Sequence, residues 1–355
     1  MKLSATSALH IALVAFSCLA AAVTRASDAS ILLVRPSETD PAIKTFDLPH
    51  RIYLRSTATA GPDAPALLRN QLLLWIPGTA SPAAGKGKAK ATQTTSSEPP
   101  PDADSPAANT AGREGSEAFC QLAARLGYHV ISLRYPNDRS ASAARLDEDP
   151  AEFERFRMAI IVGGTSKYIT IPRIESIEHR LIKLLQYLAS ARPGENWNQF
   201  LNADGTIRWE AIAVAGQSQG GGHAMLIGLH HRVARVIATG APKDYNLKLD
   251  APAAWLTRES ATPKSRFFTF NHLQDRQAAT WPQQLANLRA LQLDAFGSFV
   301  IVESAEPPYR HSRMLATNYP GGTLTSQEAH TTVISFRNAA IFEPVWRYML
   351  SEPVE

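Results

Sequence analysis

Residues 216–220 read Gly-Gln-Ser-Gln-Gly, and this stretch decides the fold. The apolar run 211–215 precedes it, and a second, mostly apolar run follows at 221–227. A buried strand, a sharp turn with a serine at its tip and a helix use three such segments in that order. Glycines suit the turn because a Cβ at either end would collide with the neighbouring strand or helix. The stretch predicts a nucleophile elbow that presents Ser218, although a plain strand-to-helix connection that contains a serine also fits it.

A serine hydroxyl needs a base before it attacks a carbonyl group, and a histidine oriented by a carboxylate can supply that base. Residues 265–270 predict a strand that leads into a loop with Asp275, and residues 299–302 predict a further strand. His330 comes after both strands and before a predicted closing helix. The order serine, acid, histidine is the one that this kind of elbow requires. Ser218, Asp275 and His330 are therefore the predicted catalytic triad.

Each partner of the serine has a rival. His311 also follows the predicted strand, but Arg310 and Arg313 beside it would oppose an imidazolium, whereas Glu328 lies near His330. Asp244 follows the preceding predicted strand and is the alternative acid, or it pairs with Lys243 at the surface. Three further histidines are expected to have structural roles in the fold: His129, His223 and His272.

Acyl transfer also requires hydrogen-bond donors for the negative charge that develops on the carbonyl oxygen. One donor is expected to be the backbone N–H of Gln219, directly after the nucleophile. Residues 72–76 predict an earlier strand, which ends at Pro77-Gly78-Thr79. Thr79 is the predicted second donor, Gly78 is the alternative, and a plain Pro-Gly turn is the competing interpretation.

With these motifs the chain resembles the α/β-hydrolase superfamily over roughly residues 51–350. It is similar in particular to secreted bacterial serine esterases with a G-x-S-x-G elbow. The resemblance implies a doubly wound, mostly parallel sheet and hydrolysis of a small-molecule or polymeric ester through an acyl-enzyme at Ser218. Many relatives carry histidine where this chain has Gln217, so substrate preference does not transfer. A non-catalytic binding or structural protein that keeps the elbow is the alternative.

The amino terminus has the pattern of a secretory signal peptide. Lys2 precedes the mostly apolar stretch 11–23, which is shorter than the roughly 20 residues that span a bilayer. Cleavage after Ala26 predicts a secreted or periplasmic domain of residues 27–355 with no membrane span. Of the two cysteines, Cys120 would then remain alone, in an apolar helical pattern that predicts a buried thiol.

Two segments stand apart from the alternating strands and helices. Residues 80–112 are rich in Ala, Pro, Ser and Thr and hold no aromatic residue, which predicts a disordered insertion after the oxyanion-loop strand. Residues 136–172 lie where a cap often inserts and are predicted to line the substrate pocket.

Composition indicates an ordinary globular enzyme. The 355 residues are 45% hydrophobic and 19% charged, with a formal net charge of +4. No basic run interleaved with aromatic residues is present, so we expect no nucleic-acid partner. The sequence has no dinucleotide fingerprint, phosphate loop or metal-ligand spacing, and we expect no cofactor.

Overall fold

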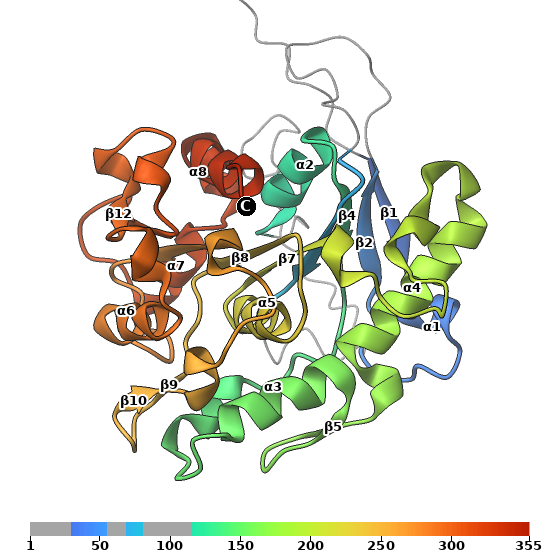
Figure 1. The fold of residues 1–355 in the computed structure, drawn as a ribbon, viewed down its shortest axis with the longest axis horizontal. Coiled ribbons are helices and arrows are strands. Elements are labelled where there is room, and N and C mark those ends of the chain that lie inside the picture. The colour runs from blue at the N-terminus through green and yellow to red at the C-terminus, as the bar shows by residue number, and fades with distance from the viewer. Residues whose placement is uncertain (1–29, 55–68, 81–114, 355) are drawn as a thin grey trace, which may run out of the picture.

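The computed structural model describes residues 30–54, 69–80 and 115–354. The predicted signal peptide and all of the predicted insertion except Ala80 lie outside these ranges. A nine-stranded sheet forms the centre of the described part (Figure 1). Its strands follow the order β1-β2-β4-β3-β7-β8-β11-β13-β12. β1 and β2 are antiparallel to their neighbours, and the strands from β4 onward pair in parallel.

The strands of this sheet are short and mostly buried. Their bounds are β1 Ser30–Val34, β2 His50–Leu54, β3 Leu72–Ile76, β4 His129–Ser132, β7 Ile212–Gln217, β8 Arg235–Thr239, β11 Phe267–His272, β12 Val300–Ile301 and β13 Met314–Thr317. Two small hairpins accompany the sheet: β5 Gly164–Thr165 with β6 Thr170–Ile171, and β9 Tyr245–Asn246 with β10 Ala251–Pro252.

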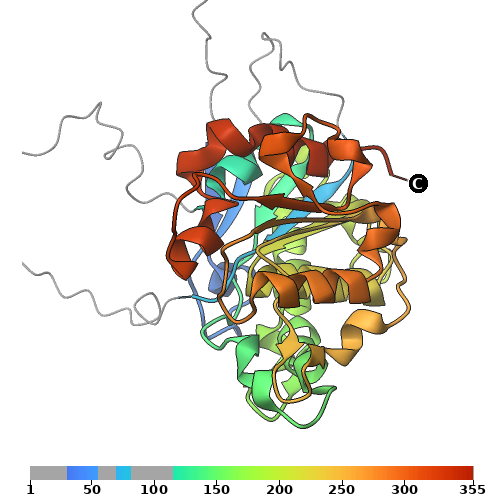
Figure 2. The same ribbon diagram turned by 90° about the vertical axis from the view of Figure 1, so that its left-hand side faces the viewer.

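Helices cover both faces of the sheet (Figure 2). Their bounds are α1 Pro36–Thr39, α2 Glu117–Arg125, α3 Glu152–Val162, α4 Ile177–Ala191, α5 Gln219–His230, α6 Trp281–Ala290, α7 Ser326–Thr332 and α8 Ala339–Ser351. Strand β3 shows why both faces are covered, because all five of its residues are apolar and buried. Leu72, Leu74 and Ile76 join the core under α4 and α5. Leu73 and Trp75 join the core under α2 and α8.

This arrangement confirms the predicted doubly wound, mostly parallel sheet. The strand predicted at residues 299–302 is present at the far edge of the sheet, but it is shorter than predicted and holds only the two residues of β12. Strand β13 was missed, although it lies between β11 and β12 and completes the sheet. Its sequence, Met-Leu-Ala-Thr, holds a single β-branched residue and no aromatic residue, so it carries a weak strand signal.

Two smaller predictions concern single features of the chain. Cys120 lies in α2 and is buried, as its apolar helical surroundings predicted. Among the described residues, no helix is both long enough and apolar enough to cross a membrane.

A buried ion pair joins helix α3 to the loop after β8. Arg157 donates from Nε and Nη2 to the two carboxylate oxygens of Asp244, at 2.6 and 2.5 Å, and both side chains are 1% exposed. Trp255 donates a further hydrogen bond to Asp244 at 2.9 Å. The third guanidinium nitrogen, Nη1, donates to the backbone oxygen of Gln219 at 2.9 Å. Segment 136–172 is thereby fixed to the first turn of α5, next to Ser218.

We predict that Arg157→Met lowers the free energy of unfolding by about 3–5 kcal/mol, because it leaves the Asp244 carboxylate buried without its cation. Arg155→Met on the same helix is the control, since Arg155 pairs with Asp149 and Glu152 while 44% exposed. It should cost about 1 kcal/mol or less. Urea denaturation measures both values, and equal losses would contradict the assigned role of Arg157.

Candidate active site

The turn between β7 and α5 holds Ser218 in a strained backbone conformation. Its φ of 57° and ψ of −121° are values that a residue with a side chain rarely adopts. A Cβ at Gly220 would lie 1.9 Å from the carbonyl oxygen of Ile76, and one at Gly216 would lie 2.4 Å from the carbonyl carbon of Gly220. Both positions therefore exclude a side chain, as the sequence predicted for a nucleophile elbow.

The end of β3 lies against this turn. A Cβ at Gly78 would be 3.2 Å from Cβ of Ser218, so Gly78 brings the β3 loop close to the serine. Asn137 fixes the loop with two hydrogen bonds. Its side-chain Nδ2 donates to the backbone oxygen of Gly78 at 2.6 Å, and its backbone oxygen accepts from the Ala80 N–H at 2.9 Å. Within the described ranges, no hydrogen bond uses the backbone N–H of Gln219 or of Thr79.

Asp275 and His330 meet beside the elbow. Asp275 follows β11 and is completely buried, and its Oδ2 lies 2.7 Å from Nδ1 of His330 on α7. The other carboxylate oxygen, Oδ1, accepts from the N–H of Gln277 at 2.9 Å, which holds the carboxylate in place. The imidazole packs on Gly240, where a Cβ would lie 3.1 Å from His330 Cε1.

The neighbours of His330 place it near the serine. Gly240 directly follows Thr239, whose carbonyl oxygen accepts from the Ser218 N–H at 2.9 Å. The side-chain nitrogen Nε2 of Gln217 lies 3.0 Å from Nε2 of His330. An amide nitrogen can only donate, so this contact fits the tautomer in which Nε2 of the ring accepts and Nδ1–H donates to Asp275. This tautomer leaves a lone pair on the ring nitrogen nearer the elbow, as a general base requires.

A second cation contacts the same carboxylate oxygen. Lys243, in the loop after β8, is buried and donates from Nζ to Oδ2 of Asp275. Burial opposes ionisation of Asp275, but the hydrogen bond and charge of His330, with Lys243, outweigh it and lower the pKa of Asp275. Burial also lowers the pKa of Lys243, although Asp275 partly offsets this effect. Three ionisable groups thus share one buried site.

The rival residues lie elsewhere. His311 is exposed, and its Nδ1 lies 2.5 Å from a carboxylate oxygen of Glu352 near the carboxyl terminus. Asp244 belongs to the ion pair with Arg157, so neither of its two alternative roles, as the acid or as a surface partner of Lys243, matches its contacts.

The three histidines for which the sequence predicted structural roles are buried. His223 packs edge-on against Tyr135, and burial followed by the charge of Arg157 lowers its pKa well below the usual value. His272 bonds to the carbonyl oxygen of Tyr319 at 2.9 Å, and His129 to that of Glu195 at 2.8 Å. All three positions match the structural roles that the sequence predicted.

Sequence reasoning missed the importance of three residues around the site. Lys243 looked like the partner of its neighbour Asp244, yet it bonds to Asp275 instead. Gln217 was noted only as a departure from related sequences, and Arg157 was not singled out. Gly222 is the third glycine in a row at the start of α5. It makes room for Arg157, because a Cβ there would lie 2.3 Å from the Arg157 guanidinium carbon.

The strand order, the elbow after β7, the acid after β11 and the histidine after β13 define the architecture. The chain has the α/β-hydrolase fold. Among the described residues, no cluster of His, Cys, Asp or Glu is arranged to hold a metal ion.

No family model matches the chain, and comparison with curated proteins gives no match in sequence. Solved structures do resemble it. MGS-M1, an alpha/beta hydrolase enzyme from a Medee basin deep-sea metagenome library, is 12% identical, with a TM-score of 0.40 and coverage of 91% of this chain and 97% of that one. A bacterial heroin esterase is 18% identical, with a TM-score of 0.37 and coverage of 92% and 86%.

A longer protein is also similar. The acylaminoacyl peptidase of Pyrococcus horikoshii is 11% identical, with a TM-score of 0.36 over 89% of this chain. The match covers 42% of the peptidase, so this chain spans less than half of its length. Likeness at these scores carries no conclusion about activity, which has to come from the site.

We predict that Lys243→Met moves the acid limb of the kcat/KM–pH profile for ester hydrolysis to higher pH by about one unit. The charge and hydrogen bond of Lys243 help to lower the pKa of the Asp275 carboxyl, so their removal raises that pKa and Asp275 loses its charge at a higher pH as the solution is acidified. Lys248→Met, which removes an exposed lysine paired with Glu148, is the control and should leave the profile unchanged. An unshifted acid limb in Lys243→Met would contradict this electrostatic role.

Proposed function

We propose that the protein is a serine hydrolase that cleaves carboxylic esters through an acyl-enzyme at Ser218. His330 acts as the general base, and Asp275 orients its ring. The backbone N–H groups of Gln219 and Thr79 form the oxyanion hole. The observation that carries the proposal is the 2.7 Å contact from Asp275 to His330 Nδ1, which leaves Nε2 unprotonated beside the strained elbow.

In the proposed reaction the Ser218 oxygen attacks the ester carbonyl carbon while His330 Nε2 takes the hydroxyl proton. The carbonyl π electrons move to oxygen, where the two N–H groups stabilise the negative charge. Collapse of this intermediate expels the alcohol, which receives the proton from His330. Water then attacks the acyl-serine with the same proton transfers, which releases the acid and restores Ser218.

Gln217 has to leave His330 before this cycle starts. Its amide occupies Nε2 at 3.0 Å, the atom that accepts the serine proton. Catalytic hydrogen bonds often form only when substrate binds, and a glutamine side chain can rotate away at the cost of one hydrogen bond. We infer that substrate entry displaces the Gln217 amide and brings Nε2 to the Ser218 hydroxyl.

We also propose that the protein is exported by the amino-terminal signal, which lies outside the described residues. Amide, lactone and polymeric substrates would use the same nucleophile, and transfer to an acceptor other than water would start from the same acyl-serine. A non-catalytic binding protein of this fold would keep the elbow without turnover.

We predict that His330→Ala lowers kcat on short p-nitrophenyl esters by at least about 10³-fold, the loss expected when a triad base is removed. His311→Ala should cost less than about tenfold, because His311 is exposed and pairs with Glu352. Equal losses, or a larger loss in His311→Ala, would contradict the assignment of the base.

Ser218→Ala should abolish this activity and leave the thermal midpoint nearly unchanged. The variant removes one hydroxyl, and no hydrogen bond of that hydroxyl occurs in the described part of the chain. Full hydrolysis by Ser218→Ala would rule out the acyl-enzyme. Absence of hydrolysis in the parent protein would favour the non-catalytic alternative.

A further inference from the structure

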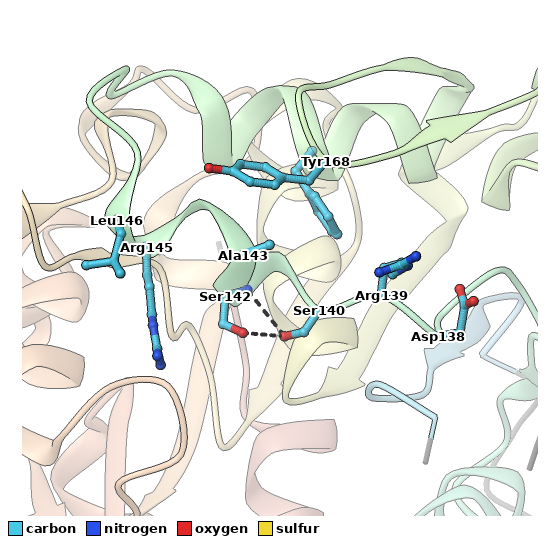
Figure 3. Close-up of a pocket in the computed structure, with 9 residues that line it drawn as sticks. Asp138, Arg139, Ser140, Ser142, Ala143, Arg145, Leu146 and Tyr168 are labelled. Atoms are coloured by element: carbon cyan, nitrogen blue, oxygen red, sulfur yellow. Dashed lines mark hydrogen bonds between the residues drawn. The ribbon is translucent and has the colours of Figure 1, made fainter. Parts of the chain in front are cut away.

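A cavity of about 570 Å³ opens in the segment between β4 and α4. Residues 138–146 form most of its wall, and Phe156 and Tyr168 complete it. The wall and the Tyr168 ring can be followed in Figure 3. Pockets for small molecules usually enclose about 300–1,000 Å³ and combine apolar walls with a few polar groups. The cavity therefore has the size and the lining of a ligand site.

Hydrogen bonds hold the cavity wall beside Ser218. The Gln219 side chain donates from Nε2 to the Arg139 oxygen and accepts at Oε1 from the Ala141 N–H, both at 2.8 Å. Asn137, directly before the wall, donates to the Gly78 oxygen at 2.6 Å. The wall is thus fixed to the residue that follows the nucleophile and to the loop that ends β3.

Two arginines on this wall have no ion-pair partner among the described residues. Arg139 and Arg145 flank Ser140 and Ser142, whose hydroxyl groups bond to each other at 2.9 Å (Figure 3). Asp138 also lines the cavity, so its charged groups comprise two cations and one anion. The two arginines therefore outweigh Asp138, and the lining of the cavity keeps a net positive charge.

The rest of the segment is different, because its charges are paired. The carboxylates beyond Asp138 each contact a cation: Asp147 with Lys167, Glu148 with Lys248, Asp149 and Glu152 with Arg155, and Glu154 with Arg258. Arg157, the remaining cation, bonds to Asp244. Among the arginines and lysines of residues 136–172, all of which the structure describes, only Arg139 and Arg145 then remain for a ligand. Guanidinium groups recognise carboxylates by charge-assisted and often bidentate hydrogen bonds.

We propose that this cavity binds the substrate, and that Arg139 and Arg145 select a substrate that carries a free carboxylate besides the ester bond. The inference rests on the proposed function at Ser218 and names its substrate class. The serine hydroxyls and the rings of Phe156 and Tyr168 contact the uncharged part of the substrate.

Binding can be measured without turnover in Ser218→Ala. Isothermal titration with 4-acetoxybenzoate and with its neutral counterpart, 4-acetoxybenzamide, compares ligands of one shape that differ in charge. We expect the carboxylate to bind about tenfold more tightly, and the advantage to weaken in high salt. Adding Arg139→Gln and Arg145→Gln should remove the difference between the two ligands.

Two further variants control for the general loss of charge. Arg232→Gln removes an exposed arginine before β8, at the opposite end of the parallel strands, and should keep the preference. Asp138→Asn removes the negative charge from the cavity lining and should increase the preference for the carboxylate ligand. Equal affinity for the two ligands, no binding of either, or equal losses in Arg232→Gln and the double variant would overturn the inference.

The kinetic arm separates this inference from the proposed function. Protein with Ser218 intact should show the same preference in kcat/KM for the two esters, and the double variant should lose this preference. Carboxylate-selective binding without hydrolysis would contradict the proposed function and support the pocket. Hydrolysis without a preference for the carboxylate would support the proposed function and contradict the inference about the cavity.

Discussion

Helix α5 begins so close to strand β3 that a methyl group at Gly220 would lie 1.9 Å from the Ile76 carbonyl oxygen. The rest of the site depends on this approach. It forces the chain through a sharp turn at Ser218, whose positive φ is the cost. It also brings the loop after β3 to the serine, so that the predicted oxyanion donors and Ser218 belong to one compact unit.

Buried charges fix the remaining groups around that unit. The Arg157–Asp244 pair fastens α3 to the first turn of α5, and Lys243 and His330 share one oxygen of Asp275. Removing charges from water is unfavourable, so such pairs do not add much stability by themselves. These pairs instead fix the positions of the side chains, because a buried carboxylate has to stay in contact with a cation or a hydrogen-bond donor.

The sequence was sufficient for the features that depend on local chemistry. The glycines of the elbow, the apolar strands and the chain order of serine, acid and histidine led to the sheet and to the contact of Asp275 with His330. Contacts between segments that are distant in the chain could not be predicted from the sequence. Lys243 stands next to Asp244 in the chain but bonds to Asp275, and β13 carries a weak strand signal. Both depend on how β8, β11 and β13 align in the sheet.

Covalent labelling tests the central claim most directly, since only an activated serine reacts rapidly with a fluorophosphonate. The protein would be treated with a fluorophosphonate probe, digested, and mapped by mass spectrometry. We predict one adduct, on Ser218, that is absent in Ser218→Ala and forms far more slowly in His330→Ala. An adduct at another serine, or no adduct in folded protein, would contradict this claim.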